Sequence, residues 1–236
     1  MKFQQPLIKA HLIKRYKRFL ADVTLTDGSV VVAHCANSGS MKGCQPEGAT
    51  VWLSPNTNPK AKLDYRWELV DVDGTLVGIN TSRPNGIVEE AILDGSITEL
   101  QGYGALKREV KYGKNSRIDI LLSEPAKGGA DKCYVEVKNV TLTDGSNQAR
   151  FPDSVTTRGT KHLNELVDMV HEGHRAVMVY LVQRGDCDHF TTADEIDSVY
   201  GDALRHALKA GVEAYCYMCD VTPDVIKVTS PLPIRL

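Results

Sequence analysis

The chain has 236 residues, with 28 Lys and Arg against 30 Asp and Glu, and 42% of its residues are hydrophobic. These values are typical of a globular protein and exclude a disordered, a collagen-like and a strongly charged chain. The longest apolar run, Ala176 to Val182, is far shorter than a membrane span, and the first residues lack the apolar stretch of a secretory signal. We therefore expect a cytoplasmic protein with no membrane partner and with reduced cysteines.

The charges are distributed unevenly along the chain. Residues 1–82 hold ten Lys or Arg and seven Asp or Glu, whereas residues 83–236 hold 18 and 23. Six Lys or Arg precede the first acidic residue, Asp22. A basic stripe of this kind suits a phosphate backbone or an anionic lipid, and it is also typical of a solvated surface. Four of its members are candidate nucleic-acid contacts: Lys14, Arg15, Lys17 and Arg18.

The sequence of residues 1–82 predicts short strands joined by turns. Two hairpins are expected, one pairing residues 18–25 with 30–35 and one pairing 67–72 with 76–79, and residues 50–53 supply a fifth strand. Five antiparallel strands in so short a segment predict a small closed barrel of the oligonucleotide-binding (OB) type, and a β-sandwich fragment is the alternative. Four aromatic residues can serve either the core or a base-stacking surface: Tyr16, Trp52, Tyr65 and Trp67.

The pattern changes after the polar stretch 80–86, and we place a domain boundary between residues 82 and 83. Apolar residues at helical spacing predict three helices, over residues 84–95, 156–172 and 194–210. Strands are predicted between and after them, over residues 106–112, 117–122, 133–142, 175–182 and 212–218. This order of elements predicts a layered α/β domain over residues 83–236.

Charged side chains interrupt two apolar strands of this second domain. In residues 117–122, strand alternation places Ile118 and Ile120 on one face and Asp119 on the other. In residues 133–138, Glu136 and Lys138 share one face. If the two strands pair, the three charged groups converge near the middle of a sheet. Burying such charges costs several kcal/mol each unless they are paired or hold a metal.

A divalent-metal site for phosphodiester cleavage explains this convergence. Asp119, Glu136 and the backbone carbonyl that follows Glu136 are oxygen ligands suited to Mg²⁺, or to Mn²⁺. Lys138 is expected to orient the attacking water and to neutralise the charge that develops on the phosphate. The preceding helix offers a third carboxylate, and we expect Glu90 rather than Glu89 because it lies closer to the apolar face of that helix.

The Glu-x-Lys pattern is weak by itself, because Glu109-Val-Lys111 is a second copy that resembles a solvated strand edge. The copy at Glu136 differs in following an Asp by 17 residues and in preceding an amphipathic helix whose start is basic. The alternative interpretation is a cross-strand salt bridge between Lys138 and one of the carboxylates.

Two residues at the start of that amphipathic helix are further candidates. Arg158 and His162 are four residues apart and therefore share one helix face. One interpretation brings both toward a phosphate beside the metal. The other leaves His162 as a residue that flanks the helix core.

Five motifs, met in order along the chain, resemble the bacterial and archaeal sugar fermentation stimulation protein family. They occupy residues 12–22, 34–41, 116–119, 134–142 and 151–163, so the resemblance covers nearly the whole sequence. It implies an OB-like barrel followed by a PD-(D/E)XK nuclease-like α/β domain, with Asp119, Glu136, Lys138 and Glu90 as the site. It also implies DNA binding without marked sequence preference and a regulatory part in sugar, particularly maltose, metabolism. Three matched positions have no role beyond a tight turn: Asn37, Gly39 and Met41.

Two functions are compatible with these residues. The first is a Mg²⁺-dependent nuclease of loose specificity, in which the barrel holds DNA, or RNA, and the acidic site cuts it. The second is a non-catalytic DNA-binding factor that regulates sugar (maltose) metabolism. The intact Asp, Glu and Lys set favours the nuclease, and no segment is typical of a helix-turn-helix.

Overall fold

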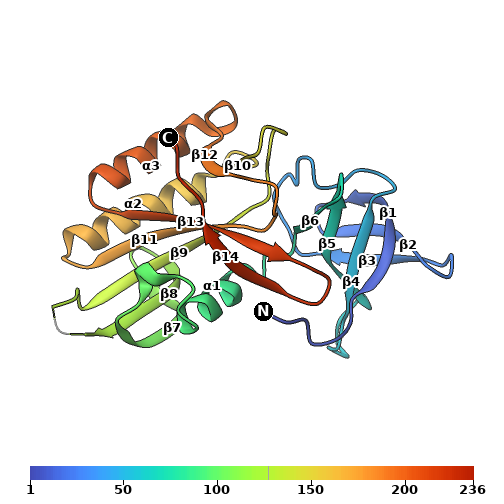
Figure 1. The fold of residues 1–236 in the computed structure, drawn as a ribbon, viewed down its shortest axis with the longest axis horizontal. Coiled ribbons are helices and arrows are strands. Elements are labelled where there is room, and N and C mark those ends of the chain that lie inside the picture. The colour runs from blue at the N-terminus through green and yellow to red at the C-terminus, as the bar shows by residue number, and fades with distance from the viewer. Residues whose placement is uncertain (127) are drawn as a thin grey trace.

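The computed structural model describes residues 1–126 and 128–236, and over this range the chain forms two six-stranded sheets in two neighbouring domains (Figure 1). The N-terminal domain contains β1 (Ile8–Tyr16), β2 (Leu20–Leu25), β3 (Val30–Cys35), β4 (Thr50–Pro55), β5 (Tyr65–Val72) and β6 (Thr75–Gly78). β1 pairs antiparallel with β2 and β4, β2 pairs with β3, and β4 pairs with β5. A parallel pairing of β3 with β5 closes the ring. The predicted barrel is therefore confirmed, and the sandwich alternative is wrong.

Both predicted hairpins are present in the barrel. The turn between β5 and β6 contains Asp73 and Gly74, both with positive φ (51° and 85°), as a two-residue hairpin turn requires. Trp67 is fully buried, and its Nε1 donates to the carbonyl of Leu69 (2.8 Å), so it belongs to the core. The sequence prediction missed β1, where the pairing register shifts after Leu12 and interrupts the alternation of side chains.

The second domain is an α/β sandwich. Its strands are β7 (Tyr103–Tyr112), β8 (Ser116–Pro125), β9 (Lys132–Val140), β10 (Gln148–Phe151), β11 (Arg175–Val182), β12 (His189–Thr192), β13 (Glu213–Val221) and β14 (Ile226–Pro231). Its helices are α1 (Pro84–Leu93), the short 3₁₀ helix η1 (Thr98–Leu100), α2 (Thr157–His171) and α3 (Asp194–Lys209). The main sheet has the order β14-β13-β11-β9-β8-β7, while β10 and β12 form a separate pair.

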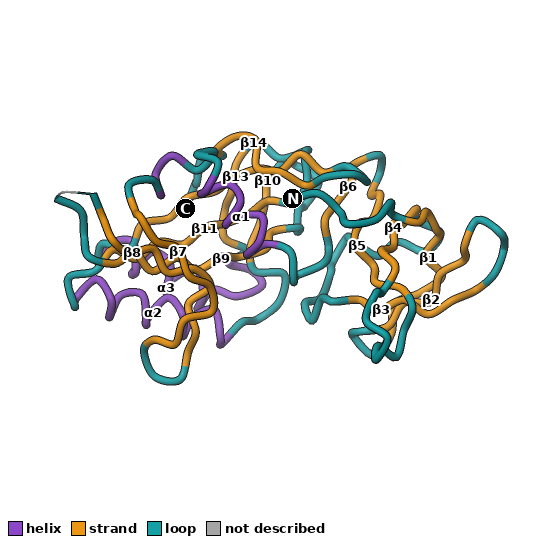
Figure 2. Tube along the Cα trace, turned by 90° about the horizontal axis from the view of Figure 1, so that it is seen from below, coloured by secondary structure: helices purple, strands orange, loops and turns teal. Residues whose placement is uncertain are grey.

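Helices cover both faces of this sheet. α2 and α3 lie on one face and α1 lies on the other, as the two views in Figures 1 and 2 agree. Strands β9, β11 and β13 run parallel, and residues 176–182 of β11 are all buried, as expected for a parallel strand with both faces covered. The three predicted helices and five predicted strands are present. The short strands β10 and β12 and the terminal β14 were missed. No helix in the described part of the chain is long and apolar enough to cross a membrane.

A buried ion pair joins the two domains. The carboxylate of Glu68 in β5 is 1% exposed and accepts hydrogen bonds from Ser54 Oγ (2.7 Å) and Asn80 Nδ2 (2.8 Å). It also accepts two from Arg83, through Nε (3.0 Å) and Nη2 (2.5 Å). Because Arg83 directly precedes α1, this contact fixes the first helix of the α/β domain against the barrel.

Candidate active site

The two candidate carboxylates lie where strands β8 and β9 separate. The ladder between these strands ends at the pair Ile120–Val135, and the next residues on each strand are Asp119 and Glu136. In place of a strand partner, the backbone N–H of Val137 donates to Oδ2 of Asp119 (2.8 Å). The carboxylate of Asp119 therefore lies in the gap between the two strands.

The position of Ile118 corrects one expectation. Alternation along β8 placed Ile118 and Ile120 on the same face of the sheet. In the structure Ile120 packs with the apolar cluster under α1, whereas Ile118 packs with the cluster under α2 and α3. The regular alternation is thus interrupted at Asp119, where β8 leaves β9.

Helix α1 supports Asp119 from the other side. Asn85, in the first turn of this helix, donates from Nδ2 to Oδ1 of Asp119 (2.8 Å). Burial raises the pKa of Asp119, and the nearby carboxylate of Glu136 raises it further. Asn85 was not predicted from the sequence, because an amide in the first turn of a helix carries no catalytic signal. Glu109, interpreted from sequence as part of a solvated edge, is exposed, and its Oε1 lies 3.4 Å from Asn85 Nδ2.

Glu136 is the most buried charged group of the site, with 2% of its side chain exposed. Its Oε1 accepts a hydrogen bond from Lys138 Nζ (2.7 Å) and contacts Nδ1 of His162. Burial raises the pKa of Glu136, but Lys138 and His162 together outweigh burial and hold that pKa below its ordinary value. Oε2 is buried and has no hydrogen-bond partner within residues 1–126 and 128–236. One carboxylate oxygen is therefore left for a further ligand.

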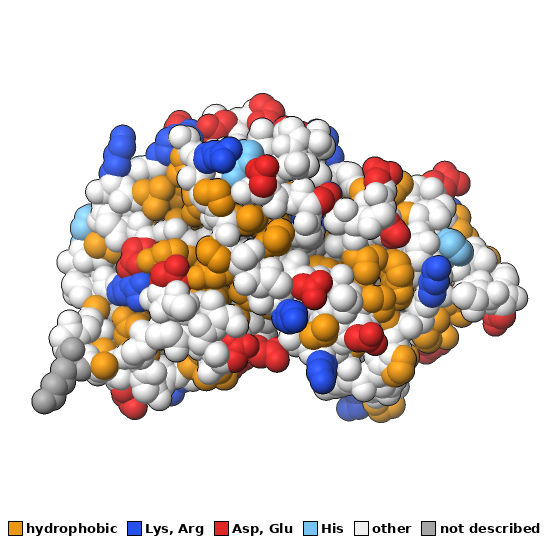
Figure 3. Space-filling model, viewed as in Figure 1, with side chains coloured by type: hydrophobic (Ala, Val, Ile, Leu, Met, Phe, Trp, Pro, Cys, Tyr) orange, Lys and Arg blue, Asp and Glu red, His pale blue; other side chains and the backbone are white. Residues whose placement is uncertain are grey.

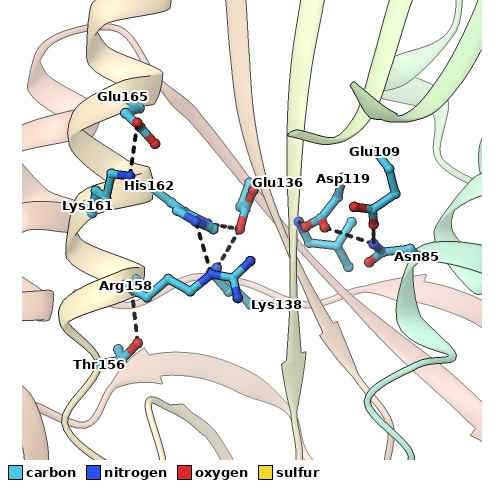
Figure 4. A network of polar contacts seen from close by, with 12 residues as sticks. Asn85, Glu109, Asp119, Glu136, Lys138, Thr156, Arg158, Lys161, His162 and Glu165 are labelled. Carbon is cyan, nitrogen blue, oxygen red and sulfur yellow. Dashed lines mark hydrogen bonds and ion pairs between the residues drawn. The ribbon is translucent and has the colours of Figure 1, made fainter. Parts of the chain in front are cut away.

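Helix α2 presents Arg158 and His162 to Glu136, and the two residues share a face as their spacing predicts (Figure 4). The helix starts at the cap residue Thr156, whose Oγ1 accepts from the N–H of Gly159 (3.0 Å). Nε of Arg158 donates to Nε2 of His162 (3.3 Å), so the tautomer with hydrogen on Nδ1 satisfies both imidazole contacts. The structure therefore places His162 as a partner of Glu136.

The structure does not bring Glu90 to this cluster. Its carboxylate pairs with the amino group of Met1 (2.5 Å), and its side chain is 55% exposed. The residue of α1 that reaches Asp119 is Asn85, five residues nearer the start of the helix. A third acidic ligand from α1 is therefore absent from the described arrangement. Among the described residues no group of three or more His, Cys, Asp or Glu is arranged to hold a metal ion.

The predicted basic stripe is divided between different roles. Lys14 lies 3.7 Å from the carboxylate of Asp22, and the guanidinium of Arg15 donates to the carbonyls of Asn37 (2.9 Å) and Gly39 (3.0 Å). Arg15 thus stabilises the barrel. Arg18 lines the cleft described below. On the face seen in Figure 3, basic and acidic side chains are interspersed over both domains, so that face is not uniformly basic.

A cleft of about 750 Å³ runs between the barrel and the α/β domain and includes the site. Arg18 and residues 37–39 line it from the barrel. The α/β domain contributes the two carboxylates, the start of α2 and the segment that leads into α2. The acidic and basic residues on this side are Asp119, Glu136, Lys138, Arg150, Asp153 and Arg158, and His162 lies beside them.

Of the matched positions, Asn37 and Gly39 line the cleft on the barrel side, and Met41 is buried in the barrel core behind them. Oδ1 of Asn37 accepts from the N–H of Gly39 (2.9 Å), and the N–H of Met41 donates to Oδ2 of Asp153 in the α/β domain (3.0 Å). A Cβ at Gly39 would lie 2.6 Å from the same Asp153 oxygen, so a larger residue does not fit. Met41 therefore joins the two domains beside the cleft, and Gly39 leaves room for the Asp153 carboxylate.

This fold and site define a two-domain protein in which an OB barrel and an α/β domain enclose a cleft that contains two buried or half-buried carboxylates and a lysine. Family models named "SfsA N-terminal OB domain" and "Sugar fermentation stimulation protein RE domain" match residues 13–79 and 82–225. The chain belongs to the SfsA family of sugar fermentation stimulation proteins.

Several relatives match this chain along its whole length. A sugar fermentation stimulation protein homolog of Paramagnetospirillum magneticum is 57% identical, covering 100% of this chain and 98% of the relative. The homolog of Geobacter metallireducens is 55% identical over 100% of both chains. The solved structure of Pyrococcus furiosus SfsA, described as a complex with Ca2+, aligns with a TM-score of 0.89 at 24% identity, covering 100% of this chain and 98% of that one. This last similarity supports the fold.

Proposed function

We propose that this protein is a divalent-metal-dependent phosphodiester hydrolase that acts on DNA with little sequence specificity. The observation that carries the proposal is the unpartnered Oε2 of Glu136, buried beside Asp119 in the interdomain cleft and without a partner among the described residues. A buried polar atom without a partner costs about 1–3 kcal/mol, and more if it is charged. A cation at this point offsets that cost.

The side chains available here fit a hard divalent cation. Asp119, Oε2 of Glu136 and the backbone carbonyl of Val137 would hold Mg²⁺ or Mn²⁺, which prefer oxygen ligands and keep several waters. The Ca2+ named for the Pyrococcus furiosus protein is also a cation that prefers oxygen ligands. When bound, the cation would supply positive charge to the phosphate oxygens.

The remaining roles belong to side chains of the cleft. Lys138 is 13% exposed and is held by Glu136, so its ammonium group has a fixed position beside the carboxylates. It is placed to orient a water molecule and to stabilise the charge that develops on phosphorus. Arg158 fixes the ring of His162 and, with Arg18 across the cleft, supplies positive charge for phosphates on either side of the reacting one.

The second candidate is a DNA-binding factor without catalysis that regulates sugar (maltose) metabolism. The names of the relatives, which refer to stimulation of sugar fermentation, favour it. It uses the same cleft and basic residues, and it differs in predicting that no phosphodiester bond is cut.

Incubation with linear duplex and single-stranded DNA, with and without Mg²⁺ or Mn²⁺, distinguishes the two functions. We expect the wild type to cut in the presence of metal and Asp119→Ala to lose cleavage by about a hundredfold or more. Asp168→Ala, an exposed position on α2, is the matched control and should cut like the wild type. Cleavage by Asp119→Ala at the wild-type rate, or no cleavage by the wild type with any metal, refutes the hydrolase. Salt-sensitive DNA binding without cleavage then supports the regulator.

A further inference from the structure

Two exposed apolar side chains belong to segments that line the cleft, one on each domain. Phe19, between β1 and β2, is 47% exposed and follows Arg18, which lines the cleft from the barrel. Val155, between β10 and α2, is 71% exposed and lines the cleft from the α/β domain. Single exposed apolar residues are common on protein surfaces. These two are distinguished by their segments, because each segment also carries an arginine that lines the same cleft, Arg18 on the barrel and Arg158 on the α/β domain.

The turn that carries Phe19 is held in an uncommon conformation. Lys17 and Arg18 have positive φ values of 48° and 63°, a region that residues other than glycine adopt at an energetic cost. The N–H of Phe19 donates to the carbonyl of Lys17 (2.8 Å) within the turn. Nε of Arg15 donates to the carbonyl of Arg18 (3.0 Å), and its Nη2 donates to the carbonyl of Asn37 in the cleft wall (2.9 Å). Phe19 is therefore fixed relative to the cleft.

Exposed apolar side chains such as Phe19 and Val155 have little to contact on a duplex. A double helix presents phosphates and base edges at its surface, while the flat faces of its bases are covered by their neighbours. An aromatic side chain gains contact with a base face only when that base is unpaired. Cationic groups contact the phosphates of both duplex and single-stranded DNA. The apolar residues beside the cleft are therefore the groups that can select single strands over duplex.

We propose that the cleft takes single-stranded DNA and that Phe19, next to the cleft-lining Arg18, is a stacking surface for an unpaired base. The proposal rests on the proposed function and specifies its substrate. The backbone of the strand runs along Arg18, Lys138 and Arg158, which line the cleft. Stacking is available to every base, so this mode of binding needs no sequence preference.

Fluorescence anisotropy in the absence of divalent metal tests the proposal without cleavage. The probes are a labelled oligothymidylate of about 12 nucleotides, near the span of one OB barrel, and a hairpin duplex of matched length. We expect the wild type to bind the single strand more tightly than the duplex. Phe19→Ala should weaken single-strand binding by about 5- to 150-fold, the range for loss of one stacked base, and should leave duplex binding unchanged. Phe19→Tyr should retain binding, because the ring is kept.

Val30→Ala is the matched control, since Val30 is 62% exposed on the same barrel, at the β2–β3 hairpin. It should bind both probes like the wild type. The proposal is overturned if the duplex binds as tightly as the single strand, or if Phe19→Ala and Val30→Ala have equal affinities. Cleavage of the same probes in the presence of metal tests the hydrolase separately from the preference for single strands. A protein that stacks single strands on Phe19 but cuts neither probe refutes only the hydrolase, and one that cuts only duplex refutes only the single-strand preference.

Discussion

Removing the guanidinium of Arg83 should destabilise the junction between the barrel and the α/β domain. Arg83→Ala leaves Glu68 buried with its bonds from Ser54 and Asn80 but without a cation. Two hydrogen bonds to a charged group are lost, each worth about 1.5–3 kcal/mol. Breaking a buried ion pair costs about 3–5 kcal/mol. Because Arg83 is itself 28% exposed, solvent screens part of this loss, and we expect the lower end, about 3 kcal/mol.

Thermal unfolding followed by circular dichroism measures this loss. For a chain of this size, 1 kcal/mol shifts Tm by about 2–4 °C, so Arg83→Ala should lower Tm by about 6–12 °C. Arg108→Ala is the matched control, because its partner Glu89 is 32% exposed, Arg108 is 40% exposed, and surface pairs contribute about 0–1 kcal/mol. Equal Tm values for the two variants would refute the assignment of Arg83 and Glu68 as the junction. The Tm of Arg83→Lys should lie between the Tm values of Arg83→Ala and Arg108→Ala, since one ammonium group cannot form the two-point contact with the carboxylate.

Two further predictions concern the cleft wall and pH. Gly39→Ala should lower both Tm and DNA affinity, because its Cβ meets Asp153 at 2.6 Å. Adding Gly39→Ala to Asp153→Ala should lower Tm much less than adding it to the wild type, and equal losses would exclude this clash as the cause. Burial raises the pKa of Glu213, but Arg175 outweighs it and lowers the pKa below 4.5. The resulting stabilisation is present above pH 4.5 and is lost as pH falls through the lowered pKa, so Glu213→Gln should lower Tm at neutral pH by an amount that shrinks as the pH falls below 4.5. A constant difference would contradict it.

The sequence predicted those parts of the fold in which one physical signal acts alone. Residues 175–182 were recognised as a strand because the run is apolar throughout, and β11 has these bounds. Glu136 and Lys138 were placed on one face because the period of two holds along β9. β1 was missed because its irregularity after Leu12 breaks that period.

The parts of the site that could not be predicted depend on packing between distant elements. Glu90 was preferred over Glu89 as the third carboxylate of the site because of its position on the helix face. In the structure α1 instead brings Asn85 to Asp119, and Glu90 pairs with the amino group of Met1. Gly39 and Met41 had no assigned role because the side chain next to them, Asp153, lies more than a hundred residues later in the chain. Sequence spacing carries no information on such contacts.

The separation of β8 from β9 also gives the site a built-in spectroscopic probe. The amide proton of Val137 bonds to the carboxylate of Asp119 rather than to another strand. Any ligand that draws this carboxylate toward itself lengthens the bond, so the amide resonance of Val137 shifts even when the ligand does not touch the backbone. Occupancy of the cleft can therefore be followed by NMR at a single backbone position, without a label on the ligand and without turnover.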